Sequence, residues 1–413
     1  MRPNFLIMEM FLPSTNSPTT NRVISILDKV TQFSLATFVV FAMFSISITQ
    51  ISFAIGALSW ILKVHLTQTW KELRGTMVGI AILCFCLACV LSVITAVDSE
   101  NSIKLVKKMI QFVIFFWVAN TVQDEKQRDA LVGLLIVAGV VACVNGILPL
   151  LIPSFFSPDS LYGKSRILGT MSAPATFSGV LMLVGLLALG RSLFHKPKEY
   201  WVLGSTGIIG LCLLVTISRH AWLGYFIGAV FLLFIWNKKY LLVLPLLLAG
   251  LLLFAPDRVT DRILSLTSLQ DRVSLWKGGW EIFKDHPITG CGYKCVDSIH
   301  SQYPDPSGWI EHYRGMHSNI FQLLIDTGIV GLGLWISIWV TYFMEIFQRW
   351  RTLTEDASQN NSRGILMGAL AVILAFLAGG FFETNIYDSE VAMLLYFLMG
   401  LSLAMVKKAP RAA

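Results

Sequence analysis

Three arginines and one histidine are the residues of this chain whose types and positions could do chemistry: Arg166, Arg219, Arg272 and His317. A guanidinium group stays positively charged and can bind two phosphate oxygens at once. An imidazole can accept a proton near neutral pH, so His317 is a candidate general base. Displacing a phosphate-bearing leaving group creates negative charge, which cations held in place can stabilise. These side chains together could therefore transfer a group from a phosphate-bearing lipid to a hydroxyl group.

Each of these residues stands in a short segment with a pattern of its own. Arg166 lies in SRILGT (165–170), ahead of an apolar stretch, and Arg219 lies in SRHAWLG (218–224), a tight turn between two apolar stretches. His317 opens the apolar stretch that follows the longest polar segment. Both residues also have a purely structural interpretation. Arg219 could extend its guanidinium to the lipid head groups, and His317 could stand at a helix start with its hydrogen bonds made by nearby backbone groups. The choice depends on whether these segments meet on one side of a membrane.

The segment around Arg272 predicts an amphipathic helix. In RVSLWKGGWEIFK (272–284) the apolar residues recur at intervals of three, four and three, which is the helical period. Such a helix, with two tryptophans on its apolar face, is suited to lying along the membrane interface. Asp271 is the expected N-cap and His286-Pro287 the expected end. The alternative is a helix that only packs on the membrane domain, which would explain the tryptophans but not the arginine at its start.

Hydropathy predicts the elements that must position these segments. The chain is 55% hydrophobic with a mean hydropathy of +0.67, and apolar stretches run almost from end to end. A helix needs about 20 apolar residues to cross a bilayer, so the chain is expected to be an all-α polytopic membrane protein of about twelve transmembrane helices. The expected spans are 30–48, 51–62, 76–97, 106–122, 130–152, 174–190, 200–217, 221–236, 240–255, 319–347, 364–382 and 391–406.

The distribution of lysine and arginine predicts the orientation of these spans. Most Lys and Arg residues of the tails and short connections fall on one side, among them Lys63, Lys71, Arg191 and Arg349. By the positive-inside rule that side is cytoplasmic, so both termini are expected in the cytoplasm and the candidate residues outside it. The formal net charge of +7 then reflects membrane topology, and nucleic-acid binding is not expected.

The same reading divides the chain into five parts. The first 29 residues are rich in Ser, Thr and Asn and lack the pattern of a cleaved signal peptide, so we expect a cytoplasmic tail. The predicted parts are an N-terminal tail at 1–29, helices one to nine at 30–255, a periplasmic loop at 256–318 that carries the amphipathic helix, helices ten to twelve at 319–406, and a cytoplasmic tail at 407–413.

Cysteine usage gives little sign of a metal site. Five of the seven cysteines lie in predicted spans, where Cys is usually a small apolar filler. Cys291 and Cys295 lie in the predicted external loop and are expected to be free thiols or a disulfide. A zinc site is disfavoured because no further Cys or His pair accompanies them. With no Asp-x-Asp motif on the outer side either, no metal and no cofactor are expected.

Three motifs, taken in order, give the chain a resemblance. They are SR-x-A-W-L-G at Arg219, R-x3-W at Arg272 running into P-x2-G-x-G at Pro287, and H-x-N-x2-Q-L-L-x3-G at His317. In this order, spacing and shared side they resemble the O-antigen ligase/polymerase family of bacterial membrane glycosyltransferases. The resemblance covers residues 166–333 by motif and the rest of the chain by topology.

This resemblance implies a function and a set of partners. The family transfers a glycan from undecaprenyl pyrophosphate to an acceptor at the outer face of the bacterial inner membrane, without ATP or metal. Ligases use lipid A core as the acceptor, and polymerases use the end of another lipid-linked repeat. We expect O-antigen ligation, with O-antigen or exopolysaccharide polymerisation as the alternative. Arg219 and Arg272, with Arg166 as a third, are expected to bind the pyrophosphate and His317 to act as the catalytic base. The expected partners are the lipid-linked glycan donor, the lipid A core or growing glycan acceptor, and membrane lipids.

The rival from another functional class is a transporter of lipid-linked sugars or small anions. A proton-coupled carrier usually contains several ionisable groups inside its spans, and here Asp326 is the clearest, near the outer end of its predicted helix. Asn145 is the main central amide, and Asp326 is expected to hydrogen-bond locally. Paired broken helices, which place transporter sites at the membrane midplane, are not evident in the sequence. The sequence therefore favours an enzyme over a transporter.

Overall fold

The computed structural model describes residues 18–152, 167–195, 198–242, 267–303, 307–352 and 360–404, with a few isolated positions between 245 and 260. Within these residues all regular structure is helical. The longer helices are α1 (Pro18–Phe41), α2 (Ile46–Thr67), α3 (Thr76–Ile94), α6 (Val113–Thr121), α7 (Glu125–Leu151), α8 (Pro174–Phe194), α9 (Tyr200–Val215), α10 (Arg219–Asn237), α13 (Thr267–Asp285), α16 (Asn319–Thr352), α17 (Asn360–Gly379) and α18 (Ser389–Leu403). Shorter α-helices are α4 (Ser99–Ser102), α5 (Lys104–Met109), α14 (Val296–Ile299) and α15 (Trp309–Tyr313), and 3-10 turns cover Trp70–Glu72, Ile110–Phe112, Lys238–Leu242 and His300–Gln302.

The expectation of a polytopic helical membrane protein is confirmed. Among the described residues, eight helices are long and apolar enough to cross a membrane, namely α1, α2, α3, α7, α8, α10, α16 and α17. Two shorter apolar helices, α9 and α18, accompany them. The predicted span at 240–255 lies mostly outside the described residues, so the expected total of twelve stays a prediction.

The first helices differ in their boundaries from the sequence prediction. The first helix includes residues from Pro18 on, well before the predicted start at residue 30, because the polar stretch 18–29 is helical as well. The break between the first two helices falls after Phe41, where the Ser45 side chain accepts a hydrogen bond from the backbone N–H of Ile48. Hydropathy locates the apolar part of a helix, whereas capping residues decide where the helix starts.

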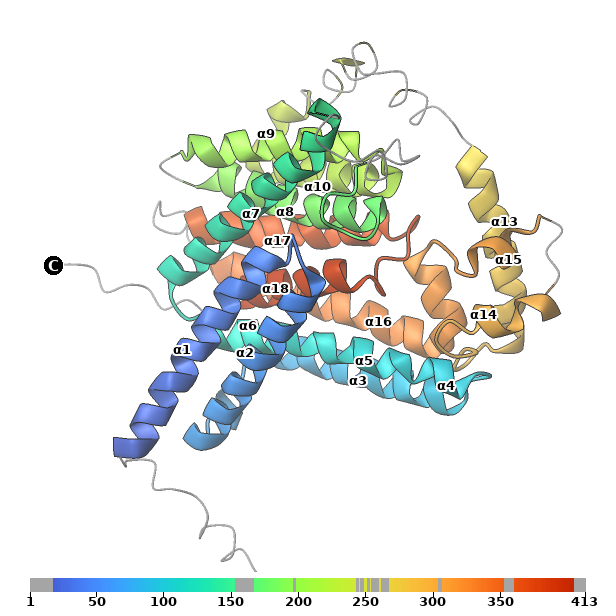
Figure 1. The fold of residues 1–413 in the computed structure, drawn as a ribbon, viewed down its shortest axis with the longest axis horizontal. Coiled ribbons are helices and arrows are strands. Elements are labelled where there is room, and N and C mark those ends of the chain that lie inside the picture. Colours follow the sequence, from blue (N-terminus) through green and yellow to red (C-terminus); the bar gives the residue numbers. More distant parts are fainter. Residues whose placement is uncertain are drawn as a thin grey trace, which may run out of the picture.

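Helices α8, α10 and α17 pack against one another within the bundle (Figure 1). Most side chains of α8 are buried. Glycines let the backbones approach closely: a Cβ atom at Gly190 would lie 2.7 Å from Gly368 Cα, and one at Gly224 would lie 2.6 Å from the carbonyl oxygen of Ala375. Small residues at helix crossings of this kind are typical of membrane helix packing. This close packing holds the start of α10, and hence Arg219, in a fixed position.

Helix α16 runs the length of the bundle beside α3 and defines its two ends. The Val78 N–H, at the start of α3, donates to Glu345 Oε1, and the Ser92 hydroxyl, near the end of α3, donates to the carbonyl oxygen of Asp326. The two helices are therefore antiparallel, so the start of α16 and the start of α3 mark opposite ends. The segment α13 to α15 lies across the end at which α16 begins (Figure 1).

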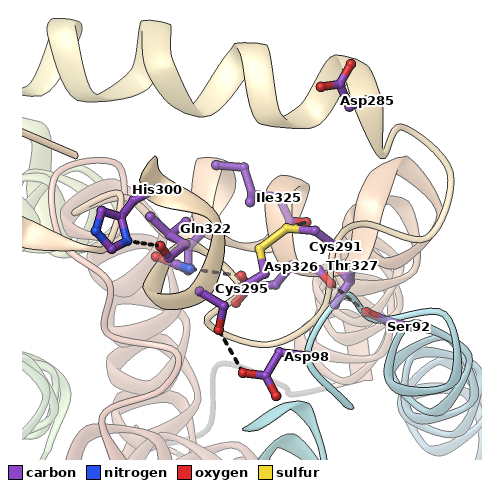
Figure 2. Close-up of a disulfide and its surroundings, with 12 residues drawn as sticks. Ser92, Asp98, Asp285, Cys291, Cys295, His300, Gln322, Ile325, Asp326 and Thr327 are labelled. Atoms are coloured by element: carbon purple, nitrogen blue, oxygen red, sulfur yellow. Dashed lines mark hydrogen bonds between the residues drawn. A yellow bond between two sulfur atoms is a disulfide. The ribbon is translucent and has the colours of Figure 1, made fainter. Parts of the chain in front are cut away.

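The segment 267–318 is folded on a small hydrophobic core of its own. Its buried members come from α13, α14, α15, the first turns of α16 and the connections that join these helices, and they are Leu275, Ile282, Cys291, Cys295, Val296, Ile299, Ile310, Met316 and Ile325. Cys291 and Cys295 form a disulfide, which decides between the two expectations for these thiols (Figure 2). Residues 272–284 are helical as predicted, and α13 ends at Asp285 as predicted, but its buried side chains are Leu275 and Ile282, whereas Val273 and Trp280 of the predicted apolar face are exposed. Helix α13 begins at Thr267, however, so the predicted N-cap at Asp271 was wrong and this residue lies inside the helix.

The glycine motif after α13, Gly290-Cys291-Gly292, has a structural role in this segment. Helix α16 is interrupted at Gly328, whose φ of 64° and ψ of −170° are not helical, and the segment around Gly290 packs into the interruption. The N–H of Cys291 donates to the carbonyl oxygen of Ile325, and the N–H of Ile329 donates to that of Pro287. A side chain at either glycine would overlap the facing backbone. The motif therefore joins α13 firmly to α16.

Candidate active site

Arg219 is held by the tight turn between α9 and α10. Ile217 has a φ of 54°, which reverses the chain, and the buried Ser218 is the N-cap residue of α10. The indole N–H of Trp222 donates to the carbonyl oxygen of Leu213 at 2.9 Å and so fixes the turn from the α10 side. The first residue of α10 is Arg219, where the helix dipole adds partial positive charge to that of the guanidinium. The turn is suited to receiving an anion.

Arg272 reaches the same end of the bundle from α13. Its guanidinium lies over the ring of Phe382, 5.7 Å from the ring centre. One turn further on, the indole N–H of Trp276 donates to the carbonyl oxygen of Met316, and its ring stacks on Phe321 with centres 5.0 Å apart. These contacts dock α13 onto the start of α16. They account for the tryptophan four residues after the arginine.

His317 lies immediately before α16 and has a φ of 45°. Its Nδ1 lies 2.9 Å from Glu383 Oε1, in the connection between α17 and α18. The same connection is tied to α16 by Asn319, whose N–H donates to the carbonyl oxygen of Gly380 and whose Oδ1 accepts from the N–H of Ile386. The asparagine two residues after the histidine thus positions the carboxylate that binds the imidazole.

One cavity of about 220 Å³ is lined by Arg219, Arg272, His317 and Glu383. The cavity brings together two of the three predicted arginines and the predicted base. The third, Arg166, lies outside the described residues. The residues that line the cavity are Ala175, Ser218, Arg219, His220, Asp271, Arg272, Leu275, Tyr313, His317 and Glu383.

The protonation state of Glu383 determines which nitrogen of His317 faces the cavity. Burial raises the pKa of Glu383, but the hydrogen bond with His317 and the nearby charges of His220, His317 and Arg272 outweigh it and lower the pKa to about 2. Glu383 is therefore an ionised acceptor at neutral pH, and Nδ1 of His317 must donate to it. In the neutral imidazole Nε2 is then the basic nitrogen, which is the atom a general base needs. A third of the His317 side chain is exposed, at 34%, so a substrate can reach it.

Sequence reasoning missed four residues of this cavity. Glu383 follows a predicted span directly and is separated from His317 by 66 residues, so only the fold reveals their contact. Asp271 was interpreted as a cap, and His220, which follows Arg219 in its motif, is buried and lines the cavity. Tyr313 was not considered. A carboxylate at the outer end of a predicted span was the one signal that could have drawn attention to Glu383.

Asp326 lies apart from the cavity, beside the disulfide (Figure 2). It is fully buried, and its Oδ1 accepts a hydrogen bond from Gln322 Nε2 at 3.0 Å. Its backbone carbonyl accepts from the N–H of Gly292 and the hydroxyl of Ser92. The expectation of local hydrogen bonding is confirmed. Asp326 therefore joins α16, α3 and the glycine motif.

Among the described residues no group of three or more His, Cys, Asp or Glu side chains is arranged to hold a metal ion. The cavity can bind an anion through its guanidinium groups and can accept a proton at Nε2 of His317. Both steps are needed to transfer a group from a phosphate leaving group to a hydroxyl.

Two comparisons with known proteins match parts of this chain. Residues 204–336 match the family model described as O-antigen ligase, and this range contains Arg219, Arg272 and His317. The chain is also similar to the exopolysaccharide production protein ExoQ of Rhizobium meliloti (strain 1021), with 24% identity over 238 residues. The match covers 54% of this chain and 50% of the relative, so the chain spans about half the length of that protein.

Proposed function

We propose that this chain, a multi-pass membrane protein whose residues 204–336 belong to the O-antigen ligase family, transfers a glycan from undecaprenyl pyrophosphate to an acceptor hydroxyl. The observation that supports this most directly is the single cavity in which Arg219, Arg272 and the His317–Glu383 pair meet. These residues come from α10, α13, the start of α16 and the α17–α18 connection, yet they face one space. The arrangement matches what glycan transfer from a pyrophosphate requires.

The proposed reaction is a displacement at the anomeric carbon of the donor glycan. The acceptor oxygen forms a bond to this carbon, and the bond between the carbon and the pyrophosphate oxygen breaks. Undecaprenyl pyrophosphate leaves with the bonding electrons, and Arg219 and Arg272 stabilise its negative charge, with Arg166 as a third cation. Nε2 of His317 takes the proton of the acceptor hydroxyl. Glu383 orients the imidazole through Nδ1 and stabilises the imidazolium that forms.

The proposed acceptor is a sugar of lipid A core, which makes the protein an O-antigen ligase. The second candidate is polymerisation, in which the acceptor is the end of another lipid-linked repeat. Similarity to a relative named for exopolysaccharide production favours this second candidate. Both use the same cavity chemistry and differ in the acceptor alone.

The proposed location is the bacterial inner membrane, with both termini in the cytoplasm and the cavity on the periplasmic face. The four site residues all lie at the end of the bundle at which α16 begins. Lys63, near the end of α2, and Lys71 and Arg74, between α2 and α3, lie by contrast at the other end. This separation supports the orientation inferred from the positive-inside rule.

The decisive test is the lipopolysaccharide banding pattern of a deletion strain, measured together with its pool of undecaprenyl-linked glycan. Loss of every glycan-bearing band, with long polymer accumulating on the lipid carrier, is expected for a ligase. Core capped by a single repeat would identify a polymerase. An unchanged pattern would contradict both and favour another polymer or transport. Complementation with Asn145→Ala separates transport from transfer, because only a transporter should depend on that central amide.

A further inference from the structure

We propose that Trp309 and Tyr313 of α15 form the subsite that binds the acceptor sugar next to the base. This inference rests on the proposed function and extends it to the acceptor. The sugar ring would pack on the aromatic faces and so present its hydroxyl to Nε2 of His317. The donor pyrophosphate would bind at Arg219 and Arg272 in the same cavity.

Helix α15 is held rigidly although it is only five residues long. Its inward side chain, Ile310, is 1% exposed and packs into the small core of segment 267–318. Helix α13 faces it with Gly278, at which any side chain would overlap Ile310. Gly308 and Arg314, at the two ends of α15, have φ values of 69° and 51°, so the chain reverses on both sides. Ile310, together with Trp309 packed against the same core, therefore fixes the position of the α15 rings.

The aromatic rings of α15 form a continuous series that ends at the base. Trp309 and Tyr313 are stacked, with centres 5.3 Å apart and an angle of 25° between their planes. Tyr313 meets the ring of His317 edge to face, with centres 4.9 Å apart. Tyr313 is 44% exposed and also lines the cavity that contains Arg272 and His317. A partly exposed aromatic ring thus adjoins the imidazole that must receive the acceptor proton.

A sugar is the substrate component that suits such a face. The faces of a pyranose ring carry C–H groups of slight positive charge, which are attracted to the negative face of an aromatic ring. Packing through its C–H face leaves the hydroxyl groups at the rim of the sugar free to hydrogen-bond. Tyr313 presents a largely apolar ring, so it suits the uncharged part of the substrates. The guanidinium groups suit the pyrophosphate.

Two other roles would explain aromatic residues at this place. Trp and Tyr at a membrane boundary often anchor a protein to the lipid head groups. The ring of Tyr313, however, lines the cavity and contacts His317, where a lipid anchor is not needed. The second role is mechanical support of the imidazole, which would affect turnover rather than acceptor affinity. The test below separates all three.

The experiment uses the full-length protein in nanodiscs of bacterial phospholipids, with saturating undecaprenyl-pyrophosphate-linked glycan and varied acceptor. The acceptors are purified lipid A core and, separately, an undecaprenyl-linked repeat. Tyr313→Leu and Trp309→Leu keep apolar volume but remove the aromatic face. For the preferred acceptor we expect Tyr313→Leu to raise KM about tenfold or more, as for loss of a stacking platform. We expect a smaller rise for Trp309→Leu. The kcat at saturating acceptor and the donor KM should change less than twofold, and Tyr313→Phe should resemble the wild type.

Trp280→Leu is the matched control, because Trp280 is an exposed tryptophan of α13 outside the cavity. An equal effect of Trp280→Leu would favour membrane anchoring, and a fall in kcat at unchanged acceptor KM would favour support of His317. Either result overturns the subsite. Binding of free core oligosaccharide or free repeat glycan, measured by saturation-transfer NMR, separates the subsite from the reaction. Binding that Tyr313→Leu abolishes, in a protein that transfers nothing, would contradict the proposed function but support the subsite. Transfer by Tyr313→Leu with unchanged KM values would support the proposed function but contradict the subsite.

Discussion

Both ends of the helix bundle contain a polar cavity, and the larger one is not the candidate active site. The cavity at His317 measures about 220 Å³, and the cavity at the other end measures about 480 Å³. The larger cavity is lined by parts of α1, α2, α6 and α7 and by the connection before α3, including Asp28, Lys63, Arg74 and Asp124. Cavity size alone would therefore direct attention to the end of the molecule away from the candidate active site.

The two cavities differ in how their charged groups are arranged. At the larger cavity Lys63 Nζ pairs with Asp28 Oδ1 at 2.5 Å, and the described lining contains neither histidine nor cysteine. At the smaller cavity the carboxylate of Glu383 binds an imidazole, beside two arginines from separate helices. The smaller cavity thus combines anion-binding groups with a basic nitrogen. The difference teaches that the combination of groups, and not the volume, identifies a site of transfer chemistry.

The largest expected effect is loss of the base. His317→Ala should lower the rate of glycan transfer by about 10²- to 10⁴-fold, the usual contribution of a general base. Donor binding should persist, because the arginines remain in place. Initial rates in nanodiscs, normalised to the amount of folded protein, measure the effect. A rate close to that of the wild type would show that the smaller cavity is not the reaction site.

The next effect in size concerns the arginines. Arg219→Ala should lower the transfer rate by about 10²- to 10³-fold, because charge on the leaving group is no longer stabilised. Arg219→Lys should restore only part of this, since a point charge cannot reproduce the two-pronged contact of a guanidinium with phosphate oxygens. Comparing the two variants with Arg272→Lys under the same assay measures the contribution of geometry. Full activity of Arg219→Lys would reduce its role to simple charge.

The sequence was most informative where the chemistry depends on residue type and order. Arg219, Arg272 and His317 were predicted on one side of the membrane from charge distribution and motif order, and the fold brings them into one cavity. The helical period likewise predicted α13, because apolar spacing is a local property. Such features need no knowledge of which distant segments pack together.

The sequence was least informative where function depends on contacts between distant segments. The hydrogen bond between His317 and Glu383 joins the connection before α16 to the connection before α18, and no local sequence pattern indicates this contact. The glycine motif near Gly290 was part of the resemblance, but its purpose became clear only from the interrupted helix at Gly328. The close fit of Ile310 against Gly278 is of the same kind. Tertiary packing decides each of these contacts.

A smaller effect is expected for Glu383, the partner that distinguishes the two cavities. Glu383→Gln should lower kcat by about 10- to 100-fold, the range for losing a partner that orients a functional histidine. The amide cannot stabilise an imidazolium as a carboxylate does. In the wild type Glu383 stays ionised down to about pH 2, so its own titration should not limit activity between pH 5 and 8. An unchanged kcat of Glu383→Gln would contradict the pairing.

The same carboxylate makes a pH-dependent contribution to stability whose sign follows from its lowered pKa. The stabilisation is fully present above the ordinary glutamate value of about 4.3 and is lost as the pH falls through about 2. Glu383→Gln should therefore lower the melting temperature at pH 7 and have less effect near pH 2. Thermal unfolding of both proteins across this range measures the difference. An equal shift at both pH values would show that the variant disturbs packing instead.

The smallest effect is expected at the larger cavity. Lys63→Met breaks the ion pair with Asp28. The side chain of Lys63 is 33% exposed and that of Asp28 is 45% exposed, so the stability change should stay below about 1 kcal/mol. Transfer kinetics should match those of the wild type, because this pair lies at the end of the bundle away from His317. The double variant Lys63→Met/Asp28→Asn controls for the carboxylate left without its partner. If Lys63→Met lowered kcat as strongly as Glu383→Gln while leaving the melting temperature unchanged, the two ends would be coupled and the larger cavity would belong to the functional machinery.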